Sequence, residues 1–176
     1  MSSLFPFRSM LRAALLVAGF VTASSACAYD WGDGFNLSKK EGDQYVLMLS
    51  PYAQHFHPSD EHKHVWLVGV ERERADHSLA GAAYFSNSFG QPSVYLYPWG
   101  QVYRSVLDQP QLYVKWTAGL MYGYREPYEN KVPFNYNGFS PAIVPAIGWE
   151  FENKYQVQLN FLGLNGAMLQ FSLPVR

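Results

Sequence analysis

Hydrophobic and polar residues alternate along much of this chain, with the period of two that is typical of β-strands. In residues 154–163 (KYQVQLNFLG), one face of the alternation is aliphatic or aromatic, and the opposite face carries Gln and Asn. The same pattern in 111–124 (QLYVKWTAGLMYGY) and 166–175 (GAMLQFSLPV) predicts two more strands. Weaker alternating segments bring the predicted number of strands to eight; they are 45–55, 64–73, 77–87, 93–103 and 142–151.

Each segment has about the length of a tilted strand that crosses a bilayer, which is roughly 9–11 residues. The polar face carries Gln, Asn, Ser, Thr and Gly, while most charges fall in the connections. We therefore predict an all-β fold over residues 45–176, an eight-stranded antiparallel up-and-down transmembrane β-barrel of the outer membrane. A soluble barrel of lipocalin type also alternates, but its exposed face would carry Lys and Glu. Aromatic residues near the strand ends fit interfacial girdles; they are Tyr45, Trp66, Tyr103, Tyr124, Trp149 and Tyr155.

The N-terminus has the pattern of an export signal. Arg8 and Arg12 precede the apolar run 13–21, and Ala26-Cys27-Ala28 resembles a cleavage site. We expect a signal peptide over 1–28, a short periplasmic segment over 29–44 and the barrel from 45. A lipid-modified Cys27 is a weaker alternative, because Ser24 stands where a bulky aliphatic residue is usual. Cleavage would remove the only cysteine, so disulfide and thiol chemistry are not expected.

Composition agrees with a protein that meets lipid. Aromatic residues make up 17% of the chain and charged residues only 15%, whereas globular domains average about 25% charged. After cleavage the net charge would be about −3, which gives no basic footprint for a nucleic-acid partner. We predict no nucleic-acid binding, no cofactor and a monomer, and no segment beyond the signal is apolar enough for a membrane helix.

Strand order assigns the connections to two sides. With a periplasmic N-terminus, 56–63, 88–92, 125–141 and 162–165 lie outside the cell, and 74–76, 104–110 and 152–153 lie in the periplasm. Protease mapping on intact cells is expected to find 125–141 outside and 104–110 inside. His55 ends the first strand and Ser88 follows the third, so we expect both at the outer rim.

A histidine and a serine at one rim make acyl transfer a hypothesis, because a base activates a hydroxyl that is otherwise a weak nucleophile. Asn87 is a candidate to orient the imidazole or to stabilise an oxyanion. Residues 54–64 (QHFHPSDEHKH) also offer metal-ligand types, but their spacing matches no familiar zinc pattern, so we predict no metal. The remaining side chains of this stretch fit a polar outer loop; they are His57, His62, Lys63 and His64.

Several motifs resemble the outer-membrane lipid A palmitoyltransferase (PagP) family. YVLMLSPYAQH (45–55) resembles its first strand, which ends in a histidine, and AAYFSNSFGQPSVYLYPWG resembles its AF-x-DS segment. WTAGL (116–120), VPAIGWE (144–150) and Asn165-Gly166 are similar to later motifs of the family. The resemblance consists of short motifs scattered over about residues 45–173.

The resemblance implies transfer of a palmitoyl chain from a glycerophospholipid to lipid A in the outer leaflet. It implies that His55 and Ser88 are the catalytic pair, with Asn87 in place of the family's aspartate. An asparagine orients an imidazole but gives no charge assistance, so Asn87→Asp is expected to preserve or raise activity. The family measures acyl length with a small interior residue, where this chain has bulky residues at about 95–97.

The resemblance also implies lateral openings for lipid, marked here by Pro51 and Pro145, with Pro141 nearby. Prolines in these strands lack a ladder donor, although simple bends would also explain them. Lys63, Arg125 and Lys131 are expected to meet lipid phosphates at the outer rim. Two other function classes stay open: a lipid A deacylase, in which the acyl group passes to water, and a non-enzymatic barrel for adhesion or membrane integrity.

Overall fold

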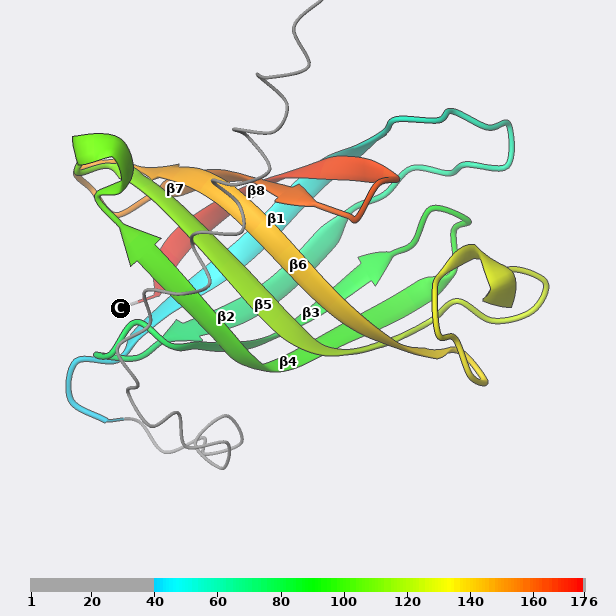
Figure 1. Cartoon of the computed structure of the whole chain (residues 1–176), viewed down its shortest axis with the longest axis horizontal. Coiled ribbons are helices and arrows are strands. Elements are labelled where there is room, and N and C mark those ends of the chain that lie inside the picture. The colour runs from blue at the N-terminus through cyan, green and yellow to red at the C-terminus, as the bar shows by residue number, and fades with distance from the viewer. Residues whose placement is uncertain (1–39, 176) are drawn as a thin grey trace, which may run out of the picture. The chain divides into compact units, whose positions relative to one another are not determined.

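The computed structural model describes residues 40–175, and these residues form a closed barrel (Figure 1). Each strand pairs antiparallel with its neighbour in sequence, and the last strand pairs with the first. The strands are β1 Gln44–His55, β2 Leu67–Glu73, β3 Leu79–Ser86, β4 Pro92–Arg104, β5 Leu112–Tyr122, β6 Phe139–Glu150, β7 Gln156–Phe161 and β8 Gly166–Val175. The predicted fold and all eight predicted strands are confirmed.

The helical content of residues 40–175 is small. Two 3₁₀ turns, η2 Val106–Asp108 and η3 Glu129–Lys131, lie in the connections. Among the helices in this range, none has the length and apolar character needed to cross a bilayer. The predicted signal peptide over 1–28, and most of the predicted segment 29–44, lie outside the described residues.

The connections gather at the two ends of the barrel in the predicted sets. One end carries the connections 56–66, 87–91, 123–138 and 162–165, and we call it the His55 rim. The other end carries 74–78, 105–111 and 151–155, and we call it the opposite rim. The connection 123–138 is the longest of the seven, as is usual for one face of a membrane barrel.

An apolar belt surrounds the barrel. Outward side chains along the strands are aliphatic and exposed, among them Val70, Leu96, Leu120 and Ile143. Aromatic rings flank this belt at both ends; they include Trp66, Tyr84 and Phe139 toward the His55 rim, and Tyr103, Trp149 and Tyr155 toward the opposite rim. Such a belt with aromatic edges is the surface that a bilayer covers in a transmembrane barrel.

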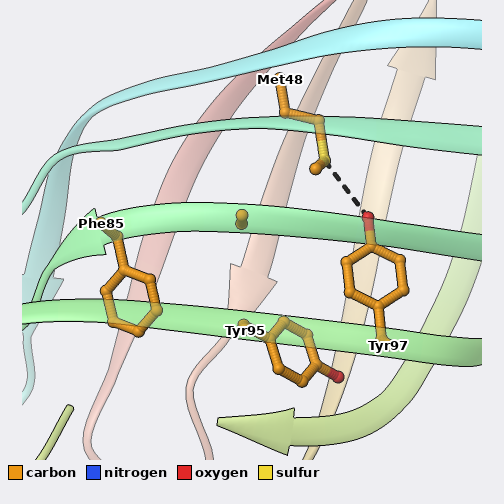
Figure 2. Packing of buried hydrophobic residues seen from close by; sticks show 5 residues of the cluster. Met48, Phe85, Tyr95 and Tyr97 are labelled. Atoms are coloured by element: carbon orange, nitrogen blue, oxygen red, sulfur yellow. Dashed lines mark hydrogen bonds between the residues drawn. The ribbon is translucent and has the colours of Figure 1, made fainter. Parts of the chain in front are cut away.

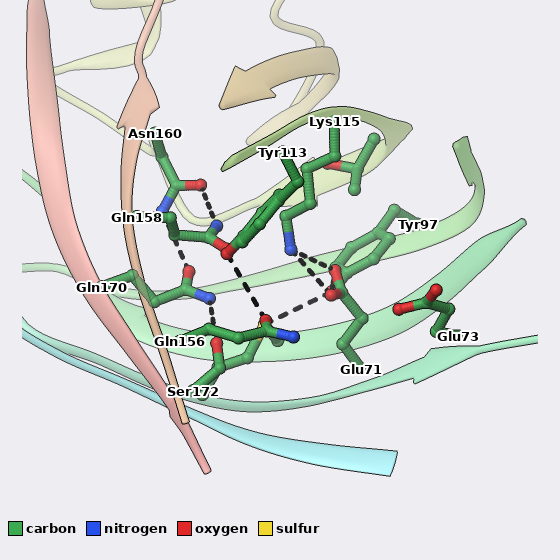
Figure 3. A network of polar contacts seen from close by, with 12 residues as sticks. Glu71, Glu73, Tyr97, Tyr113, Lys115, Gln156, Gln158, Asn160, Gln170 and Ser172 are labelled. Carbon is green, nitrogen blue, oxygen red and sulfur yellow. Dashed lines mark hydrogen bonds and ion pairs between the residues drawn. The ribbon is translucent and has the colours of Figure 1, made fainter. Parts of the chain in front are cut away.

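Polar side chains fill the interior toward the opposite rim (Figure 3). Lys115 Nζ lies 2.7 and 2.9 Å from the two carboxylate oxygens of Glu71, and Tyr97 donates to the same carboxylate at 3.0 Å. An amide chain continues across β7 and β8 through Gln158, Asn160, Gln170 and Ser172. The prediction placed most charges in the connections, but these two charged groups lie inside the barrel. They are tolerated there because each is paired and hydrogen-bonded.

The interior toward the His55 rim is apolar instead (Figure 2). Met48, Ala83, Phe85 and Tyr95 pack together there, and the Tyr97 hydroxyl oxygen lies 3.5 Å from the Met48 sulfur. The polar face of the alternation in 154–163 therefore has no continuous counterpart in this half of the interior. The alternation was clearest in β7 and β8, whose inward residues are mostly polar, whereas inward residues of β1, β3 and β4 are mainly apolar or aromatic.

Candidate functional site

The apolar half of the interior encloses a cavity of about 750 Å³ that reaches the His55 rim. Its walls include Met48, Ala83 and Phe85, and His55 and Ser88 line it at the rim. The floor is lined by Tyr97, by the Glu71–Lys115 pair and by three amide side chains of the polar network, those of Gln158, Asn160 and Gln170. Gly81 leaves room for Tyr97, because a Cβ at this position would collide with the phenol. The cavity is thus a pocket with a polar floor.

The ladder of hydrogen bonds between β1 and β2 ends beside this cavity. Their hydrogen-bonded register ends at Ser50 and Leu67, so the part of β1 from Pro51 to His55 has no partner on β2. On its other side this part pairs with β8, after an irregularity between Leu49 and Tyr52. Pro51 donates no ladder hydrogen bond and stands at the point where the pairing stops.

A second break lies between β6 and β7. Ala146 pairs with Asn160, but the residues of β6 that precede Ala146 pair only with β5. Pro145 is the first of these residues and Pro141 lies further along the same open edge. Both positions that the sequence marked as lateral gates, Pro51 and Pro145, therefore lie where a strand ladder ends.

His55 and Ser88 meet at the mouth of the cavity. Nε2 of His55 lies 2.7 Å from the Ser88 hydroxyl oxygen. His55 is the last residue of β1 and pairs with Gly166 of β8, while Ser88 lies in the short turn between β3 and β4. The juxtaposition inferred from strand parity is confirmed, and its geometry suits proton transfer from the hydroxyl to the imidazole.

Asn87 does not orient the imidazole, because its side chain is used within the turn. Its Oδ1 accepts hydrogen bonds from the backbone N–H groups of Phe89 (2.9 Å) and Gln91 (3.0 Å). Its Nδ2 donates to the Gly123 carbonyl and to the Gln91 side chain, both at 3.3 Å. The predicted contact with His55 is wrong; Asn87 instead ties the turn that carries Ser88 to the start of the β5–β6 connection.

Because of these hydrogen bonds, we expect Asn87→Asp to lower activity, whereas the family resemblance implied that it would preserve or raise it. The new carboxylate would place a second oxygen against the Gly123 carbonyl and the Gln91 side-chain oxygen in a side chain that is only 1% exposed. We expect a loss of about 1–3 kcal/mol in the free energy of unfolding, the usual effect of an unsatisfied buried polar group. We also expect lower activity. Thermal unfolding in detergent tests the change, with Asn165→Asp in an exposed loop as the control; equal midpoints for both variants would contradict it.

His62 belongs to the site, although the sequence placed it in a polar loop. Its ring stacks on the ring of His55 with centroids 4.0 Å apart and planes 26° apart. On another side it meets the edge of Phe89, whose centroid is 5.7 Å away. The alternation of the sequence could not predict the contact between His62 and His55, because this contact depends on how the connection 56–66 folds back over β1. The predicted loop position holds for His57 and His64, which are exposed.

Tyr124 is a further residue that the sequence assigned elsewhere, to an interfacial girdle. It lines the cavity with Ser88 and lies edge-on to Phe89 at 6.2 Å. Burial raises the pKa of its phenol, and hydrogen bonds with the hydroxyl and backbone of Ser88 offset part of this effect. The phenol therefore stays protonated at neutral pH, and it lies beside the candidate nucleophile.

The three cations predicted to meet lipid phosphates all lie at the His55 rim. Lys131 Nζ is 3.3 Å from a Glu61 carboxylate oxygen and 5.5 Å from the Phe89 ring centroid, at the cavity mouth. The backbone N–H of Lys63 donates to the Ser88 carbonyl at 2.8 Å, and Arg125 is exposed. Lys131 lines the cavity, whereas Lys63 and Arg125 are not among its lining residues.

Comparison with known proteins supports the fold alone. No family model matches this chain, and no curated protein matches it. A solved structure described as "De novo design of transmembrane beta-barrels" is similar, with a TM-score of 0.52 and 13% sequence identity. The similarity covers 79% of this chain and all of the designed chain. The chain is thus similar in architecture to barrels built to cross membranes.

Proposed function

We propose that this protein is an outer-membrane acyltransferase that moves a fatty acyl chain from a glycerophospholipid to lipid A. One observation carries the proposal: the His55–Ser88 pair, at 2.7 Å, lies at the mouth of an apolar cavity. An acyl chain in the cavity would place its ester at this mouth, next to the serine hydroxyl. The palmitoyl chain suggested by the family resemblance is the expected donor group.

The pair supplies the chemistry of both half-reactions. His55 takes the proton of Ser88 as the hydroxyl oxygen attacks the ester carbonyl, and returns it to the glycerol oxygen when the ester bond breaks. The acyl group is then held on Ser88. A lipid A hydroxyl next gives its proton to His55 and attacks the acyl-serine carbonyl; the bond between the acyl carbon and the serine oxygen breaks, and His55 returns the proton to that oxygen, which restores the free serine. The protonated Tyr124 phenol lies beside Ser88 and would donate to the oxyanion that develops there, a role that the sequence had given to Asn87.

The surroundings of the pair support lipid substrates. Two ladder breaks flank the cavity, at Ser50–Leu67 and at Ala146–Asn160, so a chain in the bilayer has a lateral path to the interior. Lys63, Arg125 and Lys131 at the same rim suit the phosphates of lipid A. In this proposal the His55 rim faces the cell exterior, where lipid A resides.

Mass spectrometry of lipid A tests the proposal directly. Lipid A from a host without such an activity is compared with and without the expressed protein. A gain of one palmitoyl chain is the expected result. Loss of a hydroxyacyl chain would identify a deacylase instead, and an unchanged spectrum in cells with folded barrel would favour a non-enzymatic role.

A chemical tether across the β6–β7 break is expected to block acyl transfer. Pro145 and Phe161 occupy the next positions beyond the last β6–β7 pair, so a cysteine pair there, joined by a bis-maleimide, closes the opening. We expect transfer to fall at least about 10-fold because lipid entry is gated. The matched tether joins Pro51→Cys and Trp66→Cys across the β1–β2 break.

The control places cysteines at Tyr84 and Val94, which already pair in the β3–β4 ladder. Joining this pair leaves both openings unchanged, so transfer should be unaffected. Full activity after tethering both breaks, with complete crosslinking on gels, would mean that lipid enters by another route.

A further inference from the structure

The stacked pair of His55 and His62 is held from three connections. The His62 backbone N–H donates to the Ser59 carbonyl at 3.0 Å, and that of Lys63 donates to the Ser88 carbonyl at 2.8 Å. Glu61, the preceding residue, bonds to Lys131 at 3.3 Å. Residues on both sides of His62 are therefore tied to the turn of Ser88 and to the β5–β6 connection, which fixes the ring over His55.

His55 has no carboxylate to orient it within residues 40–175. Its ring makes the bond to Ser88 and the stack on His62, and no acidic side chain is bonded to it in that range. Accepting the serine proton would give His55 a positive charge next to the apolar cavity. In serine hydrolases a buried aspartate stabilises this charge and holds the ring in orientation.

A neutral aromatic ring stacked on an imidazolium attracts it through the negative potential of the ring face. A protonated His62 would instead repel a protonated His55 at a centroid distance of 4.0 Å. Nδ1 of His62 is buried and has no hydrogen-bond partner in the described part of the chain. The stack can therefore support a charge on His55 only in the form in which the His62 ring carries none.

We propose that His62 is a positioning residue for acyl transfer: its neutral ring holds His55 toward Ser88 and supports the charge that His55 gains, in place of an orienting carboxylate. The inference rests on the proposed function.

Other charged or titratable groups around the pair are few in the described structure. Glu61 and Lys131 are bonded to each other, Lys63 passes beside Gly90, Tyr124 lies at Ser88, and His57 lies at the cavity mouth.

Three variants distinguish the effect of the stacked His62 ring from the effect of a charge on that ring. His62→Ala removes the ring, His62→Phe keeps an aromatic face that cannot be protonated, and His64→Ala is the matched control in an exposed position of the same loop. We expect His62→Ala to lower kcat about 10-fold at pH 8 with little change in KM, since small misplacements of a catalytic group cost rate. His62→Phe should stay within about 3-fold of the parent and lose activity less steeply at acid pH, because one imidazole titrates instead of two. His64→Ala should match the parent.

Three results would overturn the inference. A His62→Ala protein with the parent's kcat and pH profile would remove any positioning role. A His62→Phe protein that is as impaired as His62→Ala would show that an aromatic face does not position His55. A His62→Phe protein that loses activity at acid pH as steeply as the parent would show that the charge of His62 has no part in the effect.

Histidine NMR of the full chain in detergent keeps this test separate from the proposed function. If the two rings are stacked, their titrations are coupled, and His62→Phe abolishes the coupling seen at His55, whether or not the protein transfers acyl chains. Independent titrations of the two rings would refute the pairing. Coupled titrations in a protein that leaves lipid A unchanged would refute the transferase and preserve the pairing.

Discussion

Replacing His55 by alanine is expected to abolish most acyl transfer, with kcat lower by about 10²–10⁴-fold, the range for loss of a general base. The imidazole nitrogen 2.7 Å from the Ser88 hydroxyl is the proton acceptor in the proposed reaction. Ser88→Ala removes the nucleophile and should have an effect of similar size. Because both groups act in one step, the double variant should be little worse than either single variant.

Controls for this prediction come from the same loop. His57→Ala and His64→Ala remove exposed imidazoles at the His55 rim and should leave transfer nearly unchanged. Transfer is measured as palmitoyl incorporation into lipid A by purified protein, and the heat-dependent gel shift of each variant verifies that the barrel is folded. A folded His55→Ala protein that still acylates lipid A at the parent rate would end the catalytic interpretation.

The largest effect on stability is expected at the floor of the cavity. Lys115 and Glu71 form an ion pair whose side chains are 4% and 6% exposed. Lys115→Met leaves the carboxylate buried without its cation, and removing one partner of a buried pair costs about 3–5 kcal/mol. Urea unfolding in detergent micelles, followed by tryptophan fluorescence, should show this loss as a lower midpoint.

A variant that replaces the whole ionic group distinguishes the loss of the ion pair from the loss of side-chain volume. Glu71→Leu and Lys115→Met together remove both charges, and Tyr97→Phe removes the phenol that donates to the carboxylate. Replacing a whole buried ionic group by apolar side chains is often neutral or stabilising. The triple variant should therefore unfold close to the parent, and a midpoint as low as that of Lys115→Met would contradict this account.

The fold was predictable because the alternation is clear in β5, β7 and β8, and because weaker alternating segments of similar length follow one another along the rest of the chain. The meeting of His55 and Ser88 was predictable for the same reason, since strand parity places chain ends on one rim. Ladder breaks at Pro51 and Pro145 were predictable in position through the missing donor of proline. These features depend on local pattern and on strand count.

Features that depend on how connections fold were not predictable. His62 reaches His55 only because its neighbours bond to Ser88 and Lys131, which lie on other connections. The role of Asn87 was misassigned because a sequence motif does not reveal which backbone groups a side chain satisfies. The charged floor was missed because Glu71 and Lys115 come from β2 and β5, which are not neighbours in the barrel.

His55 pairs with the last strand of the barrel and has no partner on β2, so the proposed catalysis requires that the C-terminal strand is in place. From Tyr52 onward β1 is hydrogen-bonded only to β8, with His55 opposite Gly166. Until the C-terminal strand has docked, nothing in the sheet holds the imidazole at the serine. In the proposed reaction, nascent or partly inserted chains would therefore be inactive toward lipids, and the appearance of acyl transfer would mark the moment at which the seam between the first and last strands seals.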